Sequence, residues 1–258
     1  MSTYTPQAAS QATRVSGPAS TRPIRLGMIV PSSNTCLEPQ SYRMLGDRED
    51  VTMHSTRIPV TRIALDSASN NQFDADSMAR AAELLATAQV DVIAWNGTSG
   101  SWLGADHDRR ITDVITRNTG IPATTSTLAY FEAFERFNLS SIGLLTPYTK
   151  DVNERITQSY AASGISVRGE RHYSLSDNES FARLDAEQLV PYSQELLLQK
   201  PDALIYLCTN LYGAPAVSRL EEQFGIPVLD SVAVTLWHSL LLAEAPLLDR
   251  RWGRLLSP

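Results

Sequence analysis

The chain has few of the residues from which cross-links and metal sites are built. Its 258 residues include two cysteines, Cys36 and Cys208, and four histidines. Two cysteines do not make a disulfide framework, and neither residue type shows the spacing typical of a zinc site. Free thiols fit a reducing compartment. We therefore expect a cytoplasmic protein that holds no metal.

Positive charge and long apolar runs are also scarce. The 22 Lys and Arg residues are outnumbered by 28 Asp and Glu residues, for a net charge of −6. This balance argues against nucleic acid or an anionic membrane as partner. No apolar run approaches the roughly 18 to 20 residues needed to span a bilayer. The glycines of residues 97–104 lack the Walker lysine and the dinucleotide fingerprint, so we expect no nucleotide or other organic cofactor.

What is present is an alternation of strand and helix patterns. Residues 1–22 have no apolar period and are expected to form a disordered leader. The following strands are expected at residues 24–30, 51–58, 90–95, 122–124, 141–145, 166–171, 203–207 and 227–229. Helices are expected at 37–45, 74–88, 106–118, 126–137, 151–163, 185–199, 216–224 and 232–242, with Ser126 as a cap.

This alternation predicts an α/β protein with parallel sheets. The order of elements is similar in the two halves. We therefore expect two Rossmann-like lobes related by a pseudo-twofold axis, residues 23–139 and 140–258, each with a parallel four-stranded sheet flanked by helices and with the active site between them. Assembly into a homo-oligomer stays open.

A short internal repeat supports the two-lobe interpretation. Residues 91–99 align without a gap with residues 202–210, and each copy is followed by Gly-Ile-Pro. In this alignment Gly97 occupies the position of Cys208. The repeat is therefore broken at a position where one copy carries a thiol.

Ligands of parallel α/β sheets bind outside the carboxyl ends of the strands. The turns expected there are rich in uncharged hydrogen-bond donors, and helices starting at Leu37, Asp106 and Asp151 would add free backbone N–H groups. Such donors can hold a carboxylate and stabilise an enediolate. The topology predicts a site for a small carboxylate lined by Asn34, Gly97, Thr98, Ser99, Tyr148, Cys208 and Thr209.

A thiol such as Cys208 can act as proton donor or base near neutral pH. Thiols in both repeats would place one on each face of the reacting carbon, as a racemase needs. Gly97 removes one of them, which predicts one-sided proton delivery and a stereoselective lyase. Gly97→Cys is then expected to add racemising ability.

The same motifs resemble a known family. Gly97-Thr98-Ser99, Tyr148 in the segment 146–155, and Cys208 are similar to the arylmalonate decarboxylase pattern within the aspartate/glutamate racemase superfamily. The turn 30–35, with Pro31 and Asn34, and the turn 98–101 also resemble maleate cis-trans isomerases. The resemblance runs from about residue 24 to residue 242.

The resemblance implies a cofactor-independent decarboxylase of a substituted malonate or related small dicarboxylic acid. Thr98, Ser99, Tyr148 and the backbone N–H after Cys208 would hold one carboxylate in a dioxyanion hole, and Cys208 would protonate the enediolate. The other carboxylate would lie against apolar side chains and leave as carbon dioxide. Asn34, Thr209, Asn178 and Pro31 complete the expected substrate-binding set.

Other interpretations stay open. Cys208, with water or Cys36, could serve a racemase or a cis-trans isomerase, or the cleft could bind a carboxylate without chemistry. Individual residues also have structural alternatives: Asn34 as a helix cap, Thr98 and Ser99 as caps, Tyr148 as a rim aromatic, Asn178 as a loop residue. Trp95 and Trp102 are expected to be packing residues. Alternatively, Trp102 could form part of an apolar substrate pocket.

Overall fold

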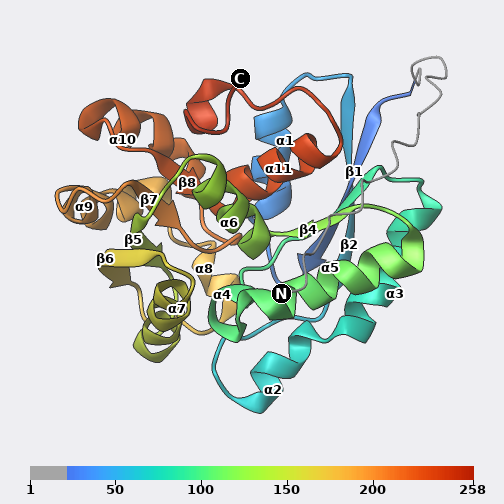
Figure 1. The fold of residues 1–258 in the computed structure, drawn as a ribbon, viewed down its shortest axis with the longest axis horizontal. Coiled ribbons are helices and arrows are strands. Elements are labelled where there is room, and N and C mark those ends of the chain that lie inside the picture. Colours follow the sequence, from blue (N-terminus) through green and yellow to red (C-terminus); the bar gives the residue numbers. More distant parts are fainter. Residues whose placement is uncertain (1–21) are drawn as a thin grey trace, which may run out of the picture.

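The computed structural model describes residues 22–258 (Figure 1). The leader predicted for residues 1–22 lies outside them except for Arg22, whose guanidinium forms a two-point ion pair with Asp91. No helix among residues 22–258 is long and apolar enough to cross a membrane.

The first half forms a parallel sheet of four strands in the order β2-β1-β3-β4. Their bounds are β1 Ile24–Pro31, β2 Val51–Ile58, β3 Val92–Trp95 and β4 Ala123–Thr125. The second half repeats this arrangement in the order β6-β5-β7-β8. Its strands are β5 Ser141–Thr146, β6 Ser166–His172, β7 Ala203–Tyr206 and β8 Val228–Asp230. The predicted pair of parallel sheets is confirmed, and its matching strand orders explain why the sequence repeat falls on β3 and β7.

Helices flank both sheets (Figure 1). Those of the first half are α1 Leu37–Leu45, α2 Ser67–Asn70, α3 Ala75–Thr87, α4 Gly100–Leu103, α5 Ala105–Thr119 and α6 Ser126–Arg136, with a 3-10 turn at Asn71–Phe73. Those of the second half are α7 Lys150–Ala162, α8 Asn178–Phe181, α9 Ala186–Leu197, α10 Val217–Phe224 and α11 Ser231–Leu242, with 3-10 turns at Ala214–Ala216 and Arg250–Trp252.

The last helix of each half packs against the other half. Helix α11 contacts β3, β4, α6 and α1, and Figure 1 shows it beside α1. In return, Tyr130 of α6 donates its hydroxyl proton toward the carbonyl oxygens of Tyr206 and Leu229 in the second sheet, at 2.8 and 3.2 Å. These buried contacts fix the relative position of the two sheets, and with it the geometry of the space between them.

The structure corrects several local predictions. The loop predicted for residues 97–104 contains the helical turn α4, and the unassigned residues 59–73 contain α2 and a 3-10 turn. Thr125, not Ser126, caps α6, because its hydroxyl accepts the backbone N–H of Leu128. Residues of the turn after a strand have similar capping chemistry, so sequence alone did not distinguish the two neighbours.

Candidate active site

A small cavity of about 20 Å³ lies at the carboxyl ends of the strands, between the two sheets. Eight of the nine predicted site residues line it: Pro31, Gly97, Thr98, Ser99, Tyr148, Asn178, Cys208 and Thr209. The ninth, Asn34, lies beside it and is not part of its wall. A larger surface groove, formed by α5, α6 and α7, contains none of these nine residues.

Three hydroxyl groups meet on one side of the cavity. The hydroxyls of Thr98 and Tyr148 lie 2.8 Å apart. The ring of Tyr148 is packed edge-on between Trp102 and Phe181, at centroid distances of 5.6 and 5.5 Å, which holds its hydroxyl in place. The Ser99 hydroxyl is buried and has no hydrogen-bond partner among the described residues. A buried, unpaired donor in a cavity is a group left free for a ligand.

Backbone donors add to this cluster. The N–H of Thr209, which directly follows Cys208, forms no hydrogen bond within residues 22–258, while the Thr209 hydroxyl is engaged with the carbonyl of Asn96 at 2.9 Å. Burial raises the pKa of Tyr148 well above its usual value, so its phenol stays a donor at any physiological pH. The cluster is uncharged and can accept one carboxylate.

Cys208 faces this cluster from the second lobe and is 3% exposed. Burial raises the pKa of its thiol to about 12, although the Tyr148 hydroxyl and the Asn210 N–H, 3.3 Å from Sγ, act in the opposite direction. The thiol is therefore protonated in the resting protein. Because the unfolded thiol ionises at a lower pH, this raised pKa stabilises the fold below pH 9 and that contribution is lost as pH rises toward 12.

The space beside Gly97 is filled by Trp95. A Cβ atom added to Gly97 would lie 2.3 Å from two carbons of the Trp95 indole and 2.5 Å from its nitrogen. Gly97→Cys therefore requires the buried indole to move, which opposes the simple gain of a second thiol expected from the repeat. Trp95 lines the cavity and is not only a core residue as predicted.

The other cysteine, Cys36, does not line the cavity. Its Sγ lies 3.0 Å from the Leu211 carbonyl oxygen and 2.8 Å from the amide nitrogen of Gln40. Burial raises the pKa of this thiol far above its usual range. Cys36 is thus held in a structural environment at the start of α1.

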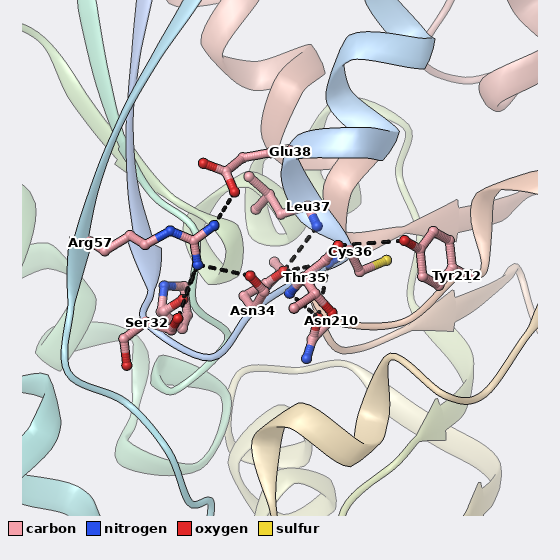
Figure 2. A network of polar contacts seen from close by, with 11 residues as sticks. Ser32, Asn34, Thr35, Cys36, Leu37, Glu38, Arg57, Asn210 and Tyr212 are labelled. Atoms are coloured by element: carbon pink, nitrogen blue, oxygen red, sulfur yellow. Dashed lines mark hydrogen bonds and ion pairs between the residues drawn. The ribbon is translucent and has the colours of Figure 1, made fainter.

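The N-terminus of α1 is closed by two asparagines (Figure 2). The side-chain oxygen of Asn34 accepts the backbone N–H groups of Cys36 and Leu37, at 3.0 and 2.9 Å. The side-chain oxygen of Asn210 accepts the N–H groups of Thr35 and Cys36. The predicted supply of free N–H groups from α1 is therefore wrong, because side chains already occupy them.

The α5 prediction is also corrected. This helix begins at Ala105, and Ala105 and Asp106 line the surface groove instead of the cavity. The chain inserts α4 between the strand and α5, which moves the end of α5 away from Thr98.

Asn34 links the α1 cap to the cavity, since its amide nitrogen lies 3.2 Å from the Thr209 hydroxyl. Asn34→Ala is expected to lower the free energy of unfolding by about 1 to 2 kcal/mol, the usual cost of losing a side-chain cap. Denaturant unfolding measures this change. Asn34→Asp keeps the capping oxygen and is the matched control; an equal loss in both variants would contradict a capping role.

Apolar side chains also line the cavity, but the residues that supply them were not predicted. Val60, Ile63 and Phe73 come from the segment after β2, whose sequence has no strand or helix period. This segment is joined to the second lobe by backbone hydrogen bonds from Ile63 to Ser176 and from Asn178 to Thr61, at 2.8 and 2.9 Å. The cavity is thus lined by uncharged donors, a thiol and apolar side chains.

Among residues 22–258, no group of three His, Cys, Asp or Glu side chains could hold a metal ion.

Comparison with known proteins gives matches along most of the chain. The sequence model described as arylmalonate decarboxylase matches residues 26–256. A maleate isomerase of Geobacillus stearothermophilus is 27% identical over 84% of this chain and 90% of its own length. An arylmalonate decarboxylase of Bordetella bronchiseptica is 26% identical, also over 84% and 90%. The crystal structure of the maleate isomerase Iso from Pseudomonas putida S16 superposes with a TM-score of 0.81 at 25% identity, covering 91% of this chain and 98% of that chain.

Proposed function

Because the chain belongs to the arylmalonate decarboxylase family, we propose that it is a cofactor-independent carboxy-lyase. Its substrate is a substituted malonate-type or related small dicarboxylic acid, and its product is the monocarboxylic acid. The observation that carries this proposal is the composition of the cavity, which brings together one protonated thiol, Cys208, uncharged donors and apolar side chains.

In the first step one carboxylate is bound by the hydroxyls of Thr98, Ser99 and Tyr148 and by the Thr209 N–H. These groups strengthen their hydrogen bonds as negative charge develops on the two oxygens. The unpaired state of the Ser99 hydroxyl supports this role, since a bound carboxylate would supply its missing partner.

The second carboxylate lies against Val60, Ile63 and Phe73. An apolar contact gives a carboxylate no hydrogen bonds, which favours its loss as neutral carbon dioxide. The carbon–carbon bond breaks, and its electron pair passes into the enediolate held by the donors. Pro31 and Asn178 complete the walls, and Asn34 acts through Thr209.

The Cys208 thiol then transfers its proton to the α-carbon, and the resulting thiolate regains a proton from water during turnover. The balance is one dicarboxylate and one proton in, one monocarboxylate and one carbon dioxide out. Since no second thiol lines the cavity in residues 22–258, the proton arrives on one face, and a malonate with two different α-substituents is expected to give a single enantiomer.

A second candidate is cis-trans isomerisation of a small dicarboxylate through Cys208. The relatives named maleate isomerase favour it. The lining of the cavity argues against it, because Gly97 stands at the counterpart of Cys208 and no second thiol of residues 22–258 lines the cavity.

One assay separates these functions. The purified protein is incubated in turn with 2-methyl-2-phenylmalonate, a 2-methyl-2-alkenylmalonate and maleate, and both carbon dioxide and the organic products are measured. We expect carbon dioxide and one enantiomer of the monoacid from a malonate. Conversion of maleate to fumarate without carbon dioxide would establish the isomerase instead, and no turnover of any of the three would favour a binding protein.

A further inference from the structure

Trp95 has an unusual position for a tryptophan at the end of a central strand. Its side chain is fully buried, and its indole N–H has no hydrogen-bond partner among the described residues. The ring lines the cavity directly beside Gly97, with its nitrogen 2.5 Å from where a Cβ of residue 97 would be. A buried N–H without a partner is costly, and such groups are rare in folded proteins.

The position of the indole defines which part of a substrate it can reach. Gly97 corresponds to Cys208 in the repeat, so the indole occupies the first-lobe counterpart of the thiol position. Trp95 and Cys208 both line the cavity, so a substrate bound there can contact both side chains. The polar cluster of Thr98, Ser99 and Tyr148 already accounts for one carboxylate.

We infer that the Trp95 N–H donates a hydrogen bond to a neutral acceptor on the α-substituent of the substrate, so that Trp95 determines specificity. This inference rests on the proposed function. The leaving carboxylate is a poor partner for this N–H, because a donor would stabilise its charge and oppose its departure. The remaining substituent is then the group that supplies the partner, as an ether, carbonyl or ring-nitrogen acceptor.

Two malonates of nearly equal shape test this assignment. Methoxymalonate carries an ether oxygen where ethylmalonate carries a methylene group. A site with an otherwise unpaired donor is expected to bind the oxygen compound about three- to tenfold more tightly, the usual range for one neutral hydrogen bond. Stopped-flow mixing measures this preference in the unmodified protein, because it resolves the binding step before turnover begins.

Trp95→Phe removes the N–H and keeps an aromatic ring. We expect it to bind the two malonates about equally, and to lose no stability through the missing donor, because that donor was unpaired. Trp252→Phe is the matched control, since the Trp252 indole nitrogen is also buried and unpaired but lies outside the cavity. It should retain the preference of the unmodified protein.

The outcomes are separable from those of the proposed function. If the unmodified protein binds both malonates equally, or if Trp95→Phe weakens both by the same factor, the indole only packs and the inference is wrong. If the Trp95-dependent preference is present but no malonate releases carbon dioxide, the inference stands and the lyase proposal fails. If carbon dioxide is released but the preference is absent, the lyase proposal stands and the inference about Trp95 fails.

Discussion

Replacing Cys208 by alanine is expected to lower kcat for malonate decarboxylation by about 10²- to 10⁴-fold, the usual contribution of a positioned proton donor. The residual product should be racemic, because water would then protonate the enediolate from either face. The measurement is carbon dioxide release together with chiral analysis of the product formed in heavy water.

Cys36→Ala is the matched control for this loss, because Cys36 is equally buried but bonded to Leu211 and Gln40 outside the cavity. Its kcat and its product enantiomer should be unchanged even if its stability falls. A racemic product from Cys36→Ala, or near-normal turnover by Cys208→Ala, would contradict the assignment of Cys208.

The raised pKa of Cys208 also predicts how kcat depends on pH. A group that must be protonated to act loses activity as pH rises through its pKa, and here that value is about 12. In the unmodified protein kcat should therefore show no decline from thiol ionisation between about pH 7 and pH 10.

Tyr148→Phe is expected to lower kcat by about 10²- to 10³-fold, as found when one donor to a developing oxyanion is removed. The phenol hydroxyl lies 2.8 Å from the Thr98 hydroxyl, so its loss also frees Thr98 to rotate away from the bound carboxylate. KM should change less than kcat, because the hydrogen bond strengthens mainly in the transition state.

Tyr160→Phe provides the corresponding control. Tyr160 is fully buried, and its hydroxyl lies 3.0 Å from the Ser101 hydroxyl, but it does not line the cavity. The two variants remove the same atom from similar surroundings, so any shared loss of stability cancels in the comparison. Equal kinetic effects of both substitutions would show that Tyr148 is a packing residue.

The sequence predicted the fold well because its signals were local and repeated. Strand patterns and turn residues located all eight strands to within a few residues, and the internal repeat indicated two lobes with matching sheets. The rule that ligands bind at the carboxyl ends of parallel strands was enough to bring Thr98, Tyr148 and Cys208 to one cavity.

Physical reasons explain why some cavity residues were not predicted from the sequence. Val60, Ile63 and Phe73 belong to an aperiodic segment, whose path depends on contacts with the other lobe. Trp95 ends a strand that is buried on both faces, so its sequence position gives no sign of which side chain reaches the cavity. Asn34 was ambiguous because capping and ligand binding need the same amide group.

The packing of α6 and α11 against the opposite halves limits how far the lobes can separate to admit a substrate. Pulling the lobes apart would strip each sheet of the helix that the opposite half contributes and would expose apolar surface to water. Releasing the backbone pairing of residues 61–63 with residues 176–178 breaks only a few hydrogen bonds. We therefore expect uptake and release of a substrate to be local events at this seam, with the two sheets keeping their relative position.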